Sequence, residues 1–178
     1  MSCPITYGYN VPCKSVGGVQ AVYIGTYNSG LTYTIDSSAP GITSSYGTIT
    51  GFGGATSSFY KFEAQIETAS LAEAGGFSVE NGTAFYTQTV EITLHNLSQA
   101  IIEQISILGK GRWRIIVLDQ AGNYWLVGKQ NPVNVTGSTP GVGKAYGDLN
   151  GAVITFEGKE PEPITQVSSA ALASLGIS

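Results

Sequence analysis

The chain has 178 residues, which is long enough for one domain with a substantial hydrophobic core. Only 11% of the residues are charged, whereas 42% are hydrophobic and 24 are glycine, so the composition excludes an intrinsically disordered chain. The net charge of −4 argues against a surface that grips nucleic-acid phosphates, and a surface with so little charge resists association poorly, which favours permanent self-assembly.

The first residues of the chain predict an N-terminal arm over residues 1–16. The first twenty residues lack a basic head followed by an apolar run, and no stretch of the chain reaches the length of a membrane helix. We therefore expect a protein of cytoplasmic origin without membrane insertion. Cys3 and Cys13 are close enough to pair across a small loop, but without an export signal two cysteines are more often reduced thiols.

Residues 17–58 begin with two β-rich runs, at residues 17–28 and 31–36. The turn signal Asn28-Ser29-Gly30 separates them and predicts an early hairpin. Residues 37–58 are rich in Ser, Gly and Thr, so one or two short strands are expected there at most. We interpret residues 25–58 as a loop-rich excursion from a β domain that spans residues 17–160.

Residues 59–68 and 83–94 show the period-two pattern of half-buried strands. In the first run, Tyr60, Phe62, Ala64 and Ile66 alternate with Lys61, Glu63, Gln65 and Glu67. In the second run, the even positions from Ala84 to Leu94 are mostly apolar and the odd positions from Thr83 to Thr93 are mostly polar. The small-residue segment 69–82 between them predicts a long hairpin with a protruding loop.

A helix is predicted after the second of these strands. Asn96 is an expected N-cap, with Gln99 three positions later as in a capping box. Gly109 is expected to end the helix. Its apolar stripe consists of Ile101, Ile102, Ile105 and Leu108.

The last third of the chain predicts one more hairpin and a closing strand. Residues 112–118 and 123–129 are β-rich and flank the turn from Asp119 to Gly122. Residues 131–147 are expected to form a glycine-punctuated loop, and residues 149–158 the closing strand. Residues 161–178 predict a C-terminal arm, extended apart from a helical turn at residues 170–175.

The sequence shows no catalytic constellation, and we expect neither an enzyme nor a bound metal or cofactor. One histidine and two cysteines are too few for a zinc site, and His95 lies at a strand end. Gly141-Val-Gly143-Lys144 resembles half of a phosphate loop, but Ser138 replaces the first glycine and Ala145 the magnesium-binding hydroxyl. Serines are common, but no G-x-S-x-G elbow is present.

Two further groups of residues can be interpreted either as a functional site or as ordinary surface and core residues. Glu63 and Glu67 would share a strand face about 13 Å apart, too far for glycoside hydrolysis, so solvated face residues are favoured. The basic and aromatic cluster comprises Arg112, Trp113, Arg114, Tyr124 and Trp125. It suits stacking on single-stranded nucleic acid or sugar, but the favoured interpretation is a hairpin in which Trp113 and one strand face are core and the arginines meet acidic neighbours.

Three stretches carry a family resemblance. Residues 111–129 are GRWRIIVLDQAGNYWLVGK, residues 138–151 are STPGVGKAYGDLNG, and residues 152–163 are AVITFEGKEPEP. They resemble the second half of tail tube proteins of long-tailed bacteriophages, particularly those that infect Bacteroidetes. The order of long hairpin, helix, hairpin and closing strand is similar to that family over residues 17–160, except for residues 25–58, which match nothing in it.

The resemblance implies a mainly β fold: an antiparallel β-sandwich or half-barrel with one flanking α-helix and a long protruding hairpin. It implies a structural subunit whose hexameric rings stack into a hollow tail tube in the virion, assembled from protein made in the host bacterial cytoplasm. The implied partners are further copies of the chain, other tail proteins, and phage DNA that passes without specific binding.

The resemblance also implies roles for two sets of residues. The polar strand face would line the tube lumen with Glu63, Gln65, Glu67, Thr87, Thr89, Glu91 and Thr93, where carboxylates repel phosphates. The loop at residues 69–82 would reach the adjacent ring through Glu73, Phe77, Val79 and Glu80. The alternatives are another virion structural protein (neck, tail terminator or capsid decoration) and a carbohydrate-binding β-sandwich with an exposed platform of Trp113, Tyr124 or Trp125.

Overall fold

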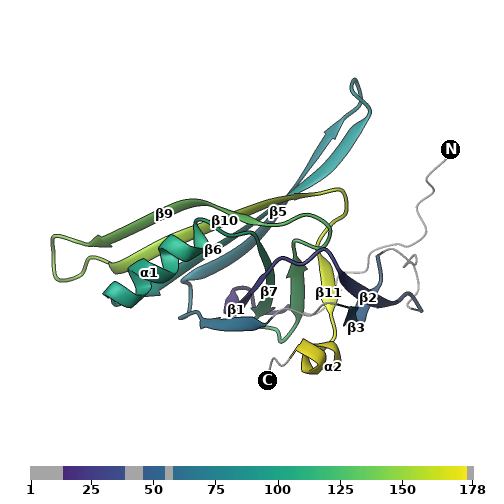
Figure 1. The fold of residues 1–178 in the computed structure, drawn as a ribbon. Coiled ribbons are helices and arrows are strands. Elements are labelled where there is room, and N and C mark those ends of the chain that lie inside the picture. Colours follow the sequence, from purple (N-terminus) through teal and green to yellow (C-terminus); the bar gives the residue numbers. More distant parts are fainter. Residues whose placement is uncertain (1–13, 39–45, 55–57, 176–178) are drawn as a thin grey trace.

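The structure is a computed structural model that describes residues 14–38, 46–54 and 58–175 (Figure 1). Strands make up 56% of the described residues and helices 11%, which confirms the predicted mainly β, sandwich-like fold. The N-terminal segment with Cys3 and Cys13, and with it the disulfide prediction, lies outside the described residues.

The larger of the two sheets has seven strands in the order β2-β3-β11-β8-β7-β1-β4. It is mixed, because β11 runs parallel to β3 and antiparallel to β8. Its strands, in chain order, are β1 (Val19–Thr26), β2 (Leu31–Asp36), β3 (Thr48–Gly54), β4 (Phe59–Glu63), β7 (Trp113–Asp119), β8 (Tyr124–Val127) and β11 (Thr165–Val167).

The smaller sheet has four antiparallel strands in the order β5-β6-β10-β9. These strands are longer: β5 (Ala69–Ser78), β6 (Thr83–His95), β9 (Asn134–Val142) and β10 (Asn150–Glu160). The far end of the β5–β6 hairpin extends beyond the rest of the molecule (Figure 1). The helix α1 (Gln99–Leu108) lies beside the opposite end of the small sheet, while α2 (Ser169–Leu172) and a 3-10 turn (Ala173–Leu175) pack against the large sheet.

The main core lies between the two sheets. Alternate residues of β1 and β7, such as Val22 and Val117, meet Val90 of β6 and Phe156 of β10 there. The intervening residues of β1 and β7 form a second cluster with Ile49 and the C-terminal helices. The central strands are therefore buried on both faces, which accounts for the uninterrupted apolar run at residues 115–118.

The predicted early hairpin is wrong. Both strands form and the Asn28 turn is present, with the Gly30 N–H donating to Asn28 Oδ1 at 2.9 Å. However, β1 pairs with β4 and β7, and β2 pairs with β3. The strands diverge because β1 finds its partners farther along the chain in β4 and β7, whereas β2 pairs with the next strand, β3. β3 is a seven-residue strand within the expected excursion. The rest of that excursion, residues 39–45 and 55–57, lies outside the described residues.

The predicted hairpin between residues 59–68 and 83–94 is also wrong. The first strand ends at Glu63, because residues 65–68 form a turn in which the Thr68 N–H donates to the Gln65 carbonyl and Glu67 has a φ of 64°. The chain then crosses to the other sheet as β5, which pairs with β6 over ten residues. The segment predicted as a loop at residues 69–82 is therefore mostly strand, and only residues 79–82 form the turn.

The predicted helix is confirmed, but its N-cap is Ser98 rather than Asn96. The Ser98 hydroxyl accepts the N–H of Ile101, whereas Asn96 has a left-handed φ of 67°. Gly109 is the C-cap as predicted. Of the predicted stripe, Leu108 is buried and Ile102 is 44% exposed.

Two segments predicted as irregular are strands. The loop expected at residues 131–147 contains β9, which pairs with β10. The arm expected at residues 161–178 contains β11, whose Val167 is buried, followed by the expected helical turn. β11 lies between β3 and β8, so the C-terminal segment joins the β2–β3 pair to the rest of the large sheet.

Candidate functional site

The strongest candidate site is the face of the four-stranded sheet that points away from the core, which we call the outer face. Residues paired across β5, β6, β10 and β9 define it, because paired residues share a face. Its central members are Ser70, Ala72, Ala74, Thr87, Thr89, Glu91, Thr93, Val153, Thr155, Glu157, Lys159, Gly137, Thr139 and Gly141.

The chemistry of the outer face is that of hydroxyls and small side chains with few charges. Glu91 and Glu157 are its carboxylates, opposite Thr155 and Thr89 respectively. Lys159 is the cation among these central members, and its Nζ lies 5.8 Å from the centre of the Phe85 ring. Such a face stays wet without offering phosphate groups a cluster of cations.

The structure brings together four of the seven residues expected in a lumen. Thr87, Thr89, Glu91 and Thr93 follow one another along the outer face of β6. Glu63, Gln65 and Glu67 do not lie on this face, since β4 belongs to the other sheet and the chain turns after it. Glu63 instead pairs with Lys61, 2.9 Å away, which lowers the pKa of this carboxyl.

The residues that β10 contributes to the outer face are new relative to the sequence prediction. Ala152, Ile154 and Phe156 are buried, while Thr155 and Glu157 between them are half-buried on the other face. The same period-two pattern is present in the sequence of residues 150–160. This pattern alone would place Thr155, Glu157 and Lys159 on a polar strand face.

The two edges of the small sheet carry unpaired main-chain groups in the described chain. β5 forms one edge and pairs only with β6, and β9 forms the other and pairs only with β10. Successive strands run in alternating directions, so the two edge strands of this four-stranded sheet are antiparallel to each other. A neighbouring copy related by rotation would place its β5 antiparallel to this β9.

The end of the β5–β6 hairpin, residues 75–85, is mostly exposed and carries the apolar side chains of Phe77, Val79 and Phe85, and we call it the tip. β10 pairs with β6 only as far as Tyr86, so the tip is a two-stranded ribbon. Phe77 is 68% exposed and Val79 fully exposed. The flat main chain at Gly75 and Gly76 leaves room for the Phe77 and Phe85 rings, because a Cβ on either glycine would lie 2.6 Å from a ring.

The residues expected in an inter-ring loop separate into two groups. Phe77, Val79 and Glu80 belong to the tip. Glu73 does not: its Oε2 accepts hydrogen bonds from Gln88 Nε2 at 3.0 Å and from the Ile164 N–H at 2.7 Å, on the inner face of the sheet. Glu73 therefore fastens the C-terminal segment to the base of the hairpin.

A buried polar network lies around residues 128–131, next to the base of the β5–β6 hairpin. Arg114 is 3% exposed, and its guanidinium donates to the carbonyls of Gly128, Lys129 and Asn28 at 2.9 to 3.2 Å. The Arg114 guanidinium also lies 4.5 Å from the centre of the Tyr27 ring. The hydrogen-bond partners of this arginine are therefore main-chain carbonyls and not the expected acidic side chains.

Glu160 belongs to the same network at the end of β10. One oxygen accepts the N–H groups of Gln130 and Asn131 at 2.9 and 2.8 Å, and the other has no hydrogen-bond partner. Burial raises the pKa of Glu160, against the lowering effect of these N–H groups and of Arg114. We therefore assign Glu160 to the packing of residues 128–131 and not to the outer face.

The remaining sequence candidates have ordinary structural roles. In the segment that resembles a phosphate loop, Asp148 Oδ2 accepts the N–H groups of Lys144 and Ala145, both at 2.7 Å, so a carboxylate already occupies these donors. Trp113 and Trp125 are half-buried, with indole N–H groups bound to Leu108 O and Asp119 Oδ2. Within residues 14–38, 46–54 and 58–175, no group of three or more His, Cys, Asp or Glu is placed to bind a metal ion.

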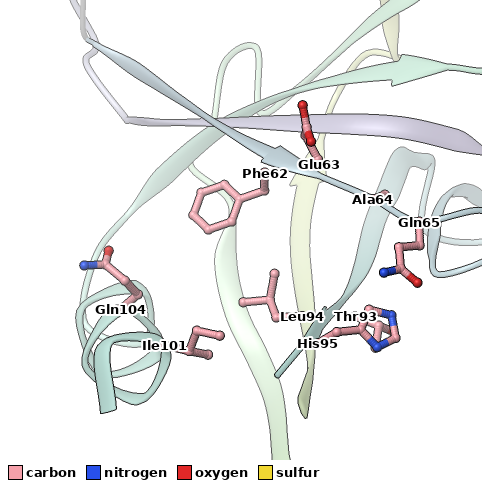
Figure 2. Close-up of a pocket in the computed structure, with 9 residues that line it drawn as sticks. All are labelled: Phe62, Glu63, Ala64, Gln65, Thr93, Leu94, His95, Ile101 and Gln104. Atoms are coloured by element: carbon pink, nitrogen blue, oxygen red, sulfur yellow. The ribbon is translucent and has the colours of Figure 1, made fainter. Parts of the chain in front are cut away.

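A pocket of about 430 Å³ opens at the end of the sandwich opposite the tip (Figure 2). The side chains of Phe62, Leu94 and Ile101 surround it, from β4, β6 and α1 respectively. Gln65, His95 and Gln104 lie at its rim, and the Glu63 carboxylate points away from it.

Comparison with known proteins gives no match: no family model, no curated protein and no solved structure matches this chain significantly. None of the helices in the described residues is long and apolar enough to cross a membrane.

Proposed function

We propose that this chain is a structural, non-catalytic subunit of a phage tail tube, in which copies form hexameric rings that stack around a polar lumen for DNA. The observation that carries the proposal is the four-stranded sheet with a packed inner face, a hydroxyl-rich outer face and two open edges of opposite direction. The motifs at residues 111–129 and 138–163 support it, because they resemble tail tube proteins. The proposed place of action is the virion, with other tail proteins as partners.

The proposed ring joins the small sheets edge to edge. An open edge is a template for strand addition, and addition of β5 to the β9 of a neighbour would remove both edges from every copy at once. Six copies would supply twenty-four strands, which at about 4.8 Å spacing and about 40° tilt form a barrel about 50 Å across. The weak overall charge fits this arrangement, since the joined surfaces meet other copies instead of water.

The proposed lumen is the outer face. Six copies would present twelve carboxylates, from Glu91 and Glu157, against six lysines, from Lys159. Hydroxyls from Thr87, Thr89 and their neighbours would keep the wall hydrated. Because binding to a phosphate backbone depends on Lys and Arg, DNA would pass this wall without adhering.

A carbohydrate-binding sandwich is less well supported, since the tryptophans that would form its platform are half-buried with their N–H groups occupied. Another virion protein, such as a neck, terminator or decoration protein, would share the capacity to assemble but would not need a polar face directed at a lumen.

The test is to purify the chain and examine it by sedimentation and negative-stain electron microscopy. We expect rings with a central hole, and tubes at higher concentration. A stable monomer at high concentration, with neither rings nor tubes in the micrographs, would refute the proposal.

A matched pair of variants tests the edge contact. Pro140 is accommodated in β9 where its nitrogen faces the open edge, so the Ser138 N–H, two residues earlier, faces the same way. Ser138→Pro should then leave the fold intact, by circular dichroism, and abolish rings, while Ser138→Ala should form them normally. Rings from Ser138→Pro would show that β9 is not the joining edge.

A further inference from the structure

The tip of the β5–β6 hairpin and the pocket between β4, β6 and α1 lie at opposite ends of one strand. β6 carries the tip at Thr83 and the pocket residues Thr93, Leu94 and His95 at its other end. A second copy translated along the strand direction would therefore bring its tip to this pocket. Repetition of such a head-to-tail contact builds a filament without a limit on length.

The tip has the properties of a segment that becomes ordered on contact. A two-stranded ribbon is marginally stable by itself, and β10 does not support this one beyond Tyr86. Phe77 packs edge-on against the Tyr86 ring, with 5.7 Å between ring centres, which leaves Val79 at the turn with its side chain in water. An exposed apolar group at the end of a projecting element favours burial against a partner.

The pocket is complementary to the tip in size and polarity. Its apolar wall of Phe62, Leu94 and Ile101 encloses about 430 Å³, enough for an apolar side chain of the size of valine or phenylalanine (Figure 2). The rim amides of Gln65 and Gln104 can bond the main chain of a β-turn.

The rim of the pocket also offers hydrogen-bond donors. Glu80 is the single charged residue of the tip. The side-chain amides of Gln65 and Gln104 and the imidazole of His95 lie at the rim. An incoming carboxylate would thus meet N–H-donating groups.

We propose that the tip of one copy inserts Val79 into the pocket formed by Phe62, Leu94 and Ile101 of the next copy, and that this contact stacks the rings. The inference rests on the proposed tube function and names the partner surface for its stacking step. The thirteen residues of β6 span about 40 Å, so with the tilt of a barrel the axial repeat should be about 30 to 40 Å.

Disulfide trapping tests the contact directly. In a Cys3→Ser, Cys13→Ser background, Val79→Cys is combined with Gln104→Cys at the pocket rim, or with Glu103→Cys, the neighbouring exposed residue of α1 that does not line the pocket. Mild oxidation should produce a covalent ladder at least about tenfold stronger for the Gln104 pair, as expected when burial of an apolar side chain favours one alignment. Equal ladders from the two pairs, or none from either, would overturn the docking contact.

A second variant separates this contact from the ring itself. Val79→Asp should give rings that no longer stack, because a carboxylate would be buried in an apolar pocket. Tubes of normal length from Val79→Asp would overturn the docking contact and leave the ring proposal standing. A ladder from the Gln104 pair in a protein that forms no rings would support the contact and refute the tube function.

Discussion

Glu160 is one of two charged side chains that are almost fully buried in the described residues, and Arg114 is the other. Both bind residues 128–131, the carboxylate through the N–H groups of Gln130 and Asn131 and the guanidinium through the carbonyls of Gly128 and Lys129. One carboxylate oxygen has no partner, so ionisation of Glu160 costs free energy in the folded state. This is the physical reason why burial raises its pKa.

Glu160→Gln should change how stability depends on pH. Because the folded state binds this proton more tightly than the unfolded chain, the contribution of Glu160 is complete below its ordinary pKa and is lost as the pH rises through the raised value. The free energy of unfolding of the wild type, relative to that of the variant, should therefore fall in urea titrations as the pH rises above the ordinary pKa of a glutamate. Parallel pH profiles for the two proteins would contradict this account.

At the scale of elements, the cap of α1 illustrates how local signals compete. Asn96 and Ser98 are both good N-cap residues, and the sequence pattern of Asn96 with Gln99 is a capping box. In the structure the chain leaves β6 through a left-handed Asn96, whose N–H donates to Asn150 O, so the helix begins two residues later. The partner strand β10 thus decides which cap is used.

Ser98→Ala should destabilise the protein by about 1 kcal/mol, the usual cost of losing an N-cap hydroxyl. Asn96→Gly is the matched control, because glycine adopts the left-handed conformation readily and the Ser98 cap remains. Chemical denaturation of both variants measures the difference. A larger loss from Asn96→Gly than from Ser98→Ala would indicate that Asn96 is the effective cap.

At the scale of the whole molecule, the outer face matters through its summed charge. A single subunit presents Glu91, Glu157 and Lys159 on this face, and a ring would multiply them around an enclosed space where the field of like charges adds. In the proposed ring, the low charge elsewhere on the chain would be a consequence of contact with other copies.

Glu91→Lys combined with Glu157→Lys should preserve tubes but make them retain DNA, with an affinity that falls steeply as salt rises. Glu103→Lys, on the exposed side of α1, is the control for added positive charge away from the outer face. Retention of DNA by assembled tubes at several salt concentrations is the measurement. Equal retention by the control would place the lumen elsewhere.

Elements whose signals are local can be predicted from the sequence. The alternation in residues 83–94, the turn between β7 and β8 and the glycine after α1 each act through neighbours a few residues away, and the structure contains all three. The same alternation predicts part of the candidate site, since Thr87, Thr89, Glu91 and Thr93 lie on one face of β6. The alternation in residues 150–160 likewise predicts which β10 residues share that face.

Strand pairing, and the formation of strands from segments with weak signals, depends on tertiary contacts. β5 and β9 are rich in Ala, Gly, Ser and Thr and have little strand propensity, but β6 and β10 offer them a complete ladder of main-chain partners. β11 forms because a gap between β3 and β8 accepts it, more than a hundred residues after β3. Strand pairing depends on hydrogen-bond partners that are distant along the chain. Because β4 pairs with β1 and β6 pairs with β5 and β10, the residues expected on one acidic face lie on two different sheets.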